Sequence, residues 1–396
     1  MELAEKIRKK AEEYREYTVG NLSDIVKIPS VTCNEKKVIE KIKTMLKEAR
    51  FDEVRVDGLG NLIGRIGKGR KILAFDAHID TVAHGDKLQW ENDPFSGEVK
   101  DGWVFGLGSA DQKGGAAAMI TSGRILKELS YKGDFSLYFT FTVMEEDCDG
   151  LCWKYLIEEE KLVPDMAVST EPSNLKITRG HRGRMEMDVH FKGRSAHGSA
   201  PERGDNAIYK AADAALKIKN LNERLKSDDF LGKGSIAVTS ISSEGVSLCA
   251  IPDRSSFHLD RRLTWGETKE SAMGEISRLL GKEVEIEIPQ FNSRSYTGLL
   301  YPQEMYFPTW KIPEDHPLVH AGDETFSLLF GEKAIVDRWT FSTNGVAICG
   351  RHRIPTIGFG PGEEKYAHAP NEKIQIEHLE KASAFYALLP FILERK

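Results

Sequence analysis

The sequence predicts an α/β fold in which a mostly parallel-sheet domain carries a second, smaller domain as an insertion. Short apolar runs of strand length alternate with helical segments over residues 1–179, and this alternation is typical of a parallel sheet. From Gly180 the pattern changes to strict alternation of apolar and polar residues, which indicates a sheet with one face in water. From about Tyr306 the first pattern returns. We therefore expect one discontinuous domain of residues 1–179 and 306–396, with an inserted domain of residues 180–305.

The first domain begins with helices and continues with strands and helices in alternation. Apolar residues at helical spacing predict helices over 1–20, 21–28, 36–49, 116–129 and 151–160. Apolar runs predict strands at 71–77, 135–143 and 166–170, and Gly and Pro residues indicate a hairpin-like region at 90–108. After the insertion we expect a helix over 318–329 and strands at 346–348 and 355–359.

The inserted segment has its own order of elements. Its first strand, 184–191, places Met185, Met187, Val189 and Phe191 on one face and charged or polar residues on the other. The elements expected after it are a helix at 206–225, strands at 235–242 and 255–264, a helix at 267–280 and a strand at 283–288. The order βαββαβ is that of the ferredoxin-like split unit, and the segment is long enough to form a small domain.

Composition narrows the class of protein. A chain of 396 residues is too long for one compact core, and 40% hydrophobic with 29% charged residues is typical of soluble proteins. The formal net charge of −6 argues against a nucleic-acid or anionic membrane partner. The N-terminus is too charged for a signal peptide, and no apolar run has membrane-spanning length. The five scattered cysteines favour a reducing, cytoplasmic location, and Cys148 and Cys152 lack the second close pair typical of a cysteine metal site.

Polar residues gather where the predicted strands end. The predicted strand 135–143 is followed by two adjacent carboxylates, Glu145 and Glu146, which either are solvated loop acids or require a cationic partner near the interior. Asp111 follows a Gly-rich loop, where backbone can approach a site closely. The other candidates at strand ends, where sites of open α/β sheets form, are His78, Asp80, Glu171 and His368.

These residue types suit a pair of divalent ions. Zinc-like ions take His nitrogen and carboxylate oxygen ligands, and a carboxylate shared by two ions is a feature of two-metal hydrolases. One acid must remain free to act as general base, and the adjacent pair Glu145 and Glu146 supplies one ligand and one base. Each residue alone has an ordinary interpretation as a surface or core residue. Their joint position at strand ends favours a site.

Six segments resemble a known family. AFDAHIDTV, GLGSADQKGG, VMEED, STEP, GRSAHGSAPERGDNA and YAHAPNE are similar to motifs of the di-zinc family of aminoacylases, acetylornithine deacetylases, succinyl-diaminopimelate desuccinylases and glutamate carboxypeptidases. The resemblance runs in family order from about Asn21 to the C-terminus. The segment LDRRLTWGE also resembles a subgroup described as selenium-metabolism-linked hydrolases. The resemblance implies a di-metal catalytic domain with an inserted lid and dimerisation domain, and hence a homodimer.

The resemblance also implies the ligand sets. One ion would be held by His78, Asp111 and Glu171, and the other by Asp111, Glu146 and His368, so that Asp111 bridges the two. Zinc is the expected metal, with cobalt and manganese as alternatives. Asp80 would orient the imidazole of His78 from behind, and Glu145 would be the general base.

Further roles follow from the same resemblance. His197 would polarise the scissile carbonyl, in many family members from the neighbouring subunit. Arg262 matches a substrate-carboxylate contact, although a solvated arginine on an exposed strand face is the alternative. Asn344, in a loop that departs from the family pattern, would face the substrate. Cys249 stands where the family has a substrate-binding Asn, and Ala77 replaces a common Gly.

The expected activity is hydrolysis of the amide bond of an N-acyl amino acid or a small peptide, of deacylase or carboxypeptidase type, by an activated water. A dipeptidase or carbamoylase on the same scaffold is an alternative. A protein that binds metal or ligand without catalysis is another, which the intact Glu145 argues against, because binding alone needs no free base.

Overall fold

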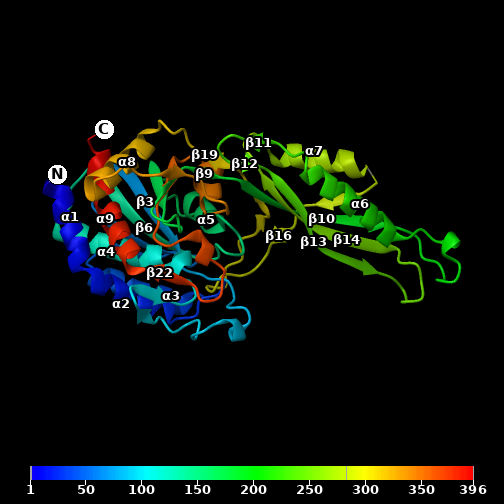
Figure 1. Cartoon of the computed structure of the whole chain (residues 1–396), viewed down its shortest axis with the longest axis horizontal. Helices are drawn as coiled ribbons and strands as arrows, with labels where there is room; N and C mark the ends of the chain where they lie inside the picture. Colours follow the sequence, from blue (N-terminus) through cyan, green and yellow to red (C-terminus); the bar gives the residue numbers. More distant parts are fainter. Residues whose placement is uncertain (1, 282, 396) are drawn as a thin grey trace.

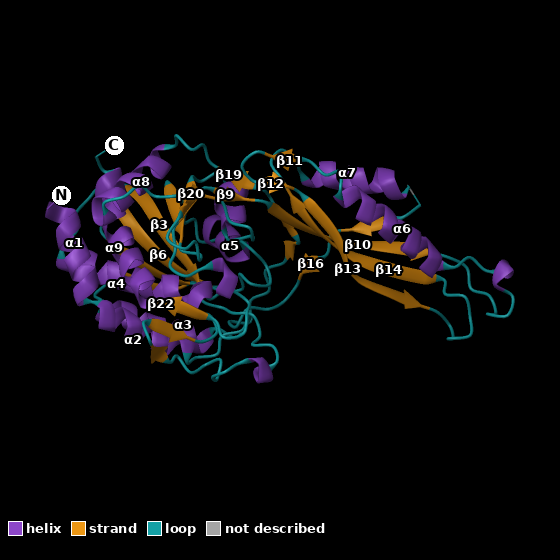
Figure 2. Ribbon diagram, in the orientation of Figure 1, coloured by secondary structure: helices purple, strands orange, loops and turns teal. Residues whose placement is uncertain are grey.

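The computed structural model describes residues 2–281 and 283–395, and these form two lobes (Figure 1). The larger lobe contains an eight-stranded sheet with helices around it, and both chain termini lie at its outer end. The smaller lobe is elongated and projects from the opposite side (Figure 2). Within the described residues, no helix combines the length and the apolar character that crossing a membrane requires.

The large sheet has a parallel centre. Its strand order is β1-β2-β6-β3-β7-β21-β8-β20, and the four strands β6, β3, β7 and β21 run parallel to one another. At one edge of the sheet, β1 pairs antiparallel with β2, and β2 pairs antiparallel with β6. The strand bounds are Glu53–Val56 (β1), Leu62–Ile66 (β2), Lys71–His78 (β3), Phe135–Thr142 (β6), Met166–Ser169 (β7), Ile177–Thr178 (β8), Val336–Asp337 (β20) and Thr356–Gly358 (β21).

Helices surround this sheet. Their bounds are Glu2–Glu13 (α1), Arg15–Val26 (α2), Lys36–Glu48 (α3), Gly114–Glu128 (α4), Leu151–Glu158 (α5), Pro317–Phe330 (α8) and Ile376–Leu393 (α9). The buried C-terminal helix α9 packs against α1, α4 and α8. A small antiparallel sheet adds Val99–Lys100 (β4), Trp103–Phe105 (β5) and Lys373–Gln375 (β22).

Apolar burial explains why β3 and β6 lie at the centre. The side chains of Phe75 and Phe139 are fully buried and stack with ring centroids 5.1 Å apart. A run this apolar leaves no face for water, which is what a strand covered by helices on both sides requires. The strands end where polar side chains begin, so the same pattern that forms the sheet also fixes the position of the site.

The smaller lobe has the βαββαβ order that the sequence predicts. Its elements are Gly183–Lys192 (β10), Ala207–Asn222 (α6), Ser235–Glu244 (β13), Arg254–Leu263 (β14), Lys269–Leu280 (α7) and Glu285–Glu287 (β15). The sheet order is β13-β14-β10-β15, all antiparallel, and β18 (Tyr306–Phe307) also pairs with β10. Helices α6 and α7 cover one face (Figure 2). On the opposite face, the side chains of β10 and β14 are polar or charged. The strand pair β9 (Gly180–His181) and β19 (Trp310–Lys311) stands where the chain leaves and re-enters the large lobe.

The remaining elements are short. They are Lys87–Gln89 (η1), Ser109–Lys113 (η2), Pro201–Arg203 (η3), Ser227–Asp228 (β11), Gly232–Lys233 (β12), Gln290–Phe291 (β16), Gln303–Glu304 (β17), Val346–Arg351 (η4) and Glu364–Tyr366 (η5).

The structure corrects two element predictions. Residues 346–348 are not a strand but the start of η4, a buried helical turn. A three-residue apolar run has the same pattern in a buried strand and in a buried helix, so the sequence does not separate them. The first helix also ends earlier than predicted, because the break falls at Tyr14 and α2 begins at Arg15 rather than near Asn21.

Candidate active site

Parallel strands bring four predicted site residues to one edge of the large sheet. His78 is the last residue of β3, the central strand. Glu145 and Glu146 follow β6 on one side of it, and Glu171 follows β7 on the other. Since β6, β3 and β7 run in the same direction, their carboxyl ends meet at one edge, as the sequence predicts.

Asp111 lies between the two imidazoles. Its Oδ1 is 3.0 Å from His78 Nε2, and its Oδ2 is 3.4 Å from His368 Nε2. The backbone that carries Asp111 is held by the buried carboxylate of Glu372, which accepts hydrogen bonds from the N–H groups of Gly108, Ala110 and Asp111 at 2.8, 2.8 and 2.9 Å. One carboxylate therefore presents one oxygen to each half of the cluster.

The remaining residues of the cluster complete the two halves. On one side, His78 Nε2 is 3.8 Å from Glu171 Oε1 and 4.0 Å from Glu145 Oε2. On the other side, His368 Nε2 is 2.8 Å from Glu146 Oε2. The groups whose ligand atoms converge within 4.8 Å are His78 with Glu145 and Glu171, and His78 with Asp111 and Glu146.

Burial disfavours the charged form of these carboxyl groups. Burial is the main cause that raises the pKa of Glu145 and of Glu171 well above the usual range. Repulsion from Glu171 also raises the pKa of Glu145, and repulsion from Asp111 and Glu146 also raises the pKa of Glu171. Burial, with the nearby Asp111 carboxylate, raises the pKa of Glu146 to about 7. Glu145 Oε1 and Glu171 Oε2 are buried and have no hydrogen-bond partner within the described part of the chain. Such a cluster calls for positive charge.

The donor set fits two divalent ions. Two ligand atoms at 2.0–2.2 Å from one tetrahedral ion lie roughly 3.4 Å apart. The separations of Asp111 from His78 and His368, and of Glu171 from His78, are 3.0, 3.4 and 3.8 Å. The donors are imidazole nitrogen and carboxylate oxygen, the ligand types that zinc-like ions bind, and the unpartnered oxygens would gain a cation.

Asp80 lies behind this cluster. Its backbone carbonyl accepts a hydrogen bond from His78 Nδ1 at 3.0 Å, which leaves Nε2 free to face the other ligands. Its carboxylate accepts the N–H groups of Glu145 and Glu146 at 3.2 and 3.1 Å. A single fully buried residue therefore fixes the orientation of one imidazole and the backbone of the acidic pair.

The cluster opens into a cavity of about 330 Å³ between the two lobes. The large lobe supplies the acids and imidazoles of the cluster together with Asp149 and Phe341. The small lobe supplies two arginines, Arg184 from β10 and Arg262 from β14. The cavity thus has an acidic floor and a basic wall.

Comparison with known proteins identifies the family of this chain. The family model described as Peptidase family M20/M25/M40 matches residues 74–390. The chain belongs to this family. It is 47% identical to the uncharacterized protein YgeY of Escherichia coli (strain K12) over 387 residues, which cover 97% of this chain and 96% of the relative. This membership confirms the prediction of a metal-dependent hydrolase of amide bonds. The selenium-linked subgroup stays a prediction.

Two further comparisons agree with the M20 assignment. The chain is 30% identical to acetylornithine deacetylase of Klebsiella pneumoniae (strain 342), over 80% of this chain and 78% of the relative. The structure of Bacillus subtilis YXEP, described as a dinuclear metal binding peptidase from M20 family, superposes with a TM-score of 0.71. Its sequence is 16% identical over 97% of this chain and 99% of that chain, so this likeness shows the fold alone.

His197 lies outside the cavity of this M20 chain. It is exposed in the loop between β10 and α6, where it forms an isolated bridge with Ala250, and its Nδ1 is 2.7 Å from Ser199 Oγ. This loop projects from the end of the small lobe away from the large lobe (Figure 1). Cys249 is exposed beside it, and its carbonyl accepts the N–H of Gly198 at 2.7 Å. The two residues share this distal surface.

Asn344 requires a correction. It is fully buried and does not line the cavity, whereas Thr340, Phe341 and Ser342 of the same loop do. Its Nδ2 donates to Asp76 Oδ2 and Thr142 Oγ1 at 2.8 and 3.2 Å, and its Oδ1 accepts from Gly150 N at 3.0 Å. The side-chain amide is used inside the core and has no donor or acceptor to offer a substrate. We therefore withdraw it from the substrate-binding set.

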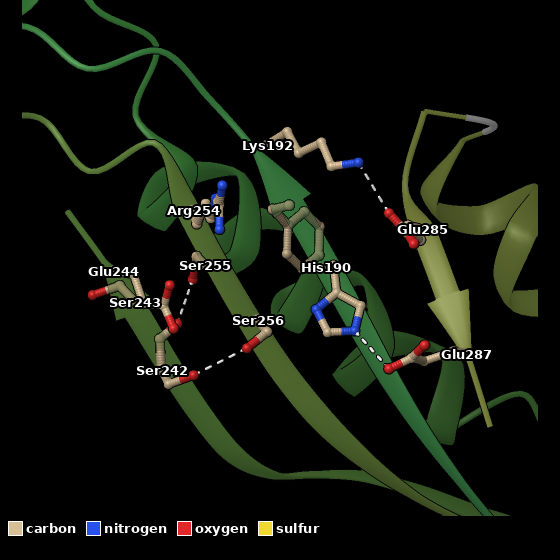
Figure 3. A pocket seen from close by; sticks show the side chains of 11 residues that line it. His190, Lys192, Ser242, Ser243, Glu244, Arg254, Ser255, Ser256, Glu285 and Glu287 are labelled. Carbon is tan, nitrogen blue, oxygen red and sulfur yellow. Dashed lines mark hydrogen bonds and ion pairs between the residues drawn. The ribbon is translucent and has the colours of Figure 1, made fainter. Parts of the chain in front are cut away.

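The polar face of the small lobe also carries a second cavity, of about 440 Å³ (Figure 3). Four of its side chains form two pairs, Lys192 with Glu285 at 3.0 Å and His190 with Glu287 at 3.3 Å. Each pair is at least a third exposed to solvent, so the pairs contribute little to stability. This cavity lacks the buried acids that distinguish the first one.

The sequence pattern does not predict that two residues, Arg184 and Glu372, belong to the site. Arg184 lies near the start of β10, in which apolar and polar residues alternate. This alternation places Arg184 on the polar face of the sheet but does not indicate that the face meets the cavity. Glu372 follows the His368 loop, and only the folded chain brings it against the Asp111 backbone. Both depend on contacts between distant segments.

Proposed function

We propose that this chain hydrolyses the amide bond of an N-acyl amino acid or small peptide, with two divalent ions, most simply zinc, bound at the strand ends. His78, Asp111 and Glu171 would hold one ion, and Asp111, Glu146 and His368 the other. The observation that carries the proposal is the position of Asp111, whose two oxygens face His78 and His368 separately. Bound there, the ions would polarise the carbonyl and lower the pKa of a water molecule.

Glu145 is the proton carrier in this proposal. Its Oε1 is buried and unpartnered within the described residues, and its backbone is fixed by Asp80, so one oxygen is free to accept a proton. Glu145 would take a proton from the attacking water and deliver it to the leaving nitrogen. The water oxygen becomes bonded to the carbonyl carbon, the C–N bond breaks, and the products are a carboxylic acid and an amine.

We also propose that His197 acts in the partner subunit of a homodimer formed through the small lobe. Its distance from its own cavity, at the tip of that lobe, supports a role in trans. The edge strand β13 has Ile241 56% exposed, and Tyr209 and Leu216 of the adjacent helix α6 are 71% and 61% exposed. Exposed edges and apolar side chains in soluble proteins are usually covered.

Five free cysteines agree with a reducing, cytoplasmic location.

A metal titration combined with an activity screen tests the proposal. Metal-free protein receives zinc, cobalt or manganese in steps, and hydrolysis of N-acetyl amino acids, dipeptides and N-carbamoyl amino acids is followed at each step. We expect two ions per chain and turnover of N-acetyl amino acids or dipeptides that a chelator abolishes. Turnover restricted to N-carbamoyl substrates would favour the carbamoylase alternative. Metal binding with no turnover of any substrate would favour a binding protein.

A further inference from the structure

The chain that leaves β6 toward the acidic pair is held by buried side chains. Four consecutive N–H groups, those of residues 143–146, donate to three side-chain acceptors. The hydrogen bonds run from Val143 to Asn61 Oδ1 at 3.1 Å, from Met144 to Glu35 Oε1 at 3.1 Å, and from Glu145 and Glu146 to the Asp80 carboxylate at 3.2 and 3.1 Å. All three acceptors are fully buried. The backbone that carries the proposed base is therefore fixed by segments distant in the sequence.

Glu35 is the acceptor whose presence its own packing does not explain. It directly precedes α3, and its Oε1 accepts the N–H groups of Met144 and Cys33 at 3.1 and 2.9 Å. Its Oε2 is buried and has no hydrogen-bond partner within the described part of the chain. A buried carboxylate with an unpartnered oxygen destabilises a fold. Stability alone therefore does not account for an acid at this position.

The N–H group that Glu35 holds belongs to the residue at which the chain turns. Met144 has a φ of +63°, in the left-handed region that a residue with a side chain rarely adopts. Its side chain is buried in the core. Directly after this turn, Glu145 Oε2 lies 4.0 Å from His78 Nε2, whereas Glu146 Oε2 lies 2.8 Å from His368 Nε2. The turn at Met144 thus directs two adjacent acids to the two halves of the cluster.

We propose that Glu35 is a positioning residue of the active site, which holds the turn at Met144 and thereby directs the acidic pair. This inference rests on the proposed function and adds to it a residue that contacts neither the substrate nor the ions. Thr32 of the same segment donates to Asp80 Oδ2 at 2.9 Å. The segment before α3 therefore supports both side chains that hold residues 144–146.

Zinc binding separates this role from a purely structural one. Calorimetry of the metal-free chain with zinc compares the wild type with Glu35→Leu, which removes the acceptor, and Glu35→Gln, which keeps an acceptor oxygen. In Glu35→Leu, we expect the affinity for the ion assigned to Glu146 to fall roughly 10- to 100-fold, the usual effect of losing a residue that orients a metal ligand. Glu35→Gln should bind zinc as the wild type does. Glu40→Leu, the same substitution at an exposed position of α3, is the matched control and should change nothing.

A split between kcat and KM provides a second readout. At saturating zinc, kcat for an N-acetyl amino acid should fall roughly 10- to 100-fold in Glu35→Leu, because the proposed base is no longer directed at the water. KM should stay close to that of the wild type, because the walls of the cavity are unchanged. Glu35→Asp retracts the carboxylate by one methylene and should show smaller losses of the same kind. This variant decides the question where Glu35→Leu does not fold.

The outcomes that refute this inference differ from those that refute the proposed function. Wild-type zinc affinity and wild-type kcat in the folded Glu35→Leu chain would overturn the role of Glu35. Equal losses in Glu35→Leu and Glu35→Gln would also overturn it, because the hydrogen-bond acceptor would then not be the feature that matters. A wild-type chain that binds no zinc, or that hydrolyses no amide, would instead refute the proposed function.

Discussion

Asn344 donates a hydrogen bond from Nδ2 to Asp76 Oδ2 at 2.8 Å, in the core beneath the strand ends that carry the proposed metal ligands. The same amide accepts hydrogen bonds from Gly150 N and Cys152 Sγ, both at 3.0 Å. It therefore joins β3, the loop before α5 and the loop before η4 in one buried network. A residue in this position supports the site by holding its base together.

Replacement of this amide tests its role. Asn344→Ala leaves several buried polar groups without partners, and each such group costs about 1–3 kcal/mol. We expect the free energy of unfolding, measured by urea denaturation, to fall by at least about 2 kcal/mol, with KM of the folded fraction nearly unchanged. Asn292→Ala, at an exposed position, is the control. A raised KM without loss of stability would restore Asn344 to the substrate-binding set.

The adjacent acids Glu145 and Glu146 should respond differently to the same chemical change. Glu145→Gln removes the proton carrier and leaves the proposed ligands in place, so turnover should fall ~10²–10⁴-fold with unchanged metal content. Glu146→Gln removes a ligand and should lower the affinity for one ion. Metal analysis and initial rates on both variants decide this. Normal turnover in Glu145→Gln would eliminate it as the base.

Subunit complementation tests His197. Glu145→Gln and His197→Ala are each expected to be inactive, but a mixed dimer has one site with both groups intact if His197 acts across the interface. Mixing and exchanging the two variants should then recover activity, measured against unmixed samples. With exchange verified by mass spectrometry, activity at background would show that His197 does not act in trans. A fully active monomer would contradict the dimer as well.

His181 predicts a pH dependence of stability. Burial, with the nearby positive charges of Arg182 and Arg262, lowers its pKa to about 4, and its Nε2 accepts a hydrogen bond from Trp310 Nε1 at 2.8 Å. An unfolded histidine titrates near 6.5, so the unfolded chain binds more protons between pH 6.5 and 4. The contribution of His181 is therefore complete above pH 6.5 and is lost as the pH falls to 4.

The magnitude of this effect is measurable. A depression of this size corresponds to about 3 kcal/mol at one pKa unit per about 1.4 kcal/mol. Urea denaturation at pH 6.5 and pH 4 should show that the wild-type chain loses more stability than His181→Gln by about this amount. An identical loss in both chains would mean that His181 titrates normally in the folded state.

Much of the site could be predicted because strand ends are visible in the sequence. The apolar runs before His78, Glu145 and Glu171 locate three strand ends, and parallel order then brings these residues together. The buried position of Asn344 could not be predicted in this way. Whether a loop residue faces a cavity or the core depends on the path of the loop, which neighbouring Trp310 and η4 determine after folding.

Contacts between the two lobes could not be predicted from the sequence either. The parity of β10 predicts that Arg184 lies on the polar face with Arg262, but only the angle between the lobes brings that face to the cavity. The antiparallel edge strands β1 and β2 were missed for another reason. They are short, and Gly64 interrupts the apolar pattern where Phe51 packs closely.

The most direct test of the account is the number of ions bound with and without Asp111. Metal analysis after gel filtration should give two divalent ions per chain for the wild type, and two for Glu145→Gln as a control that changes an acid of the same cluster. Asp111→Ala should lose both ions or nearly both, because its two oxygens face the two halves of the cluster. Two tightly bound ions in Asp111→Ala would contradict the shared ligand and with it the two-ion site.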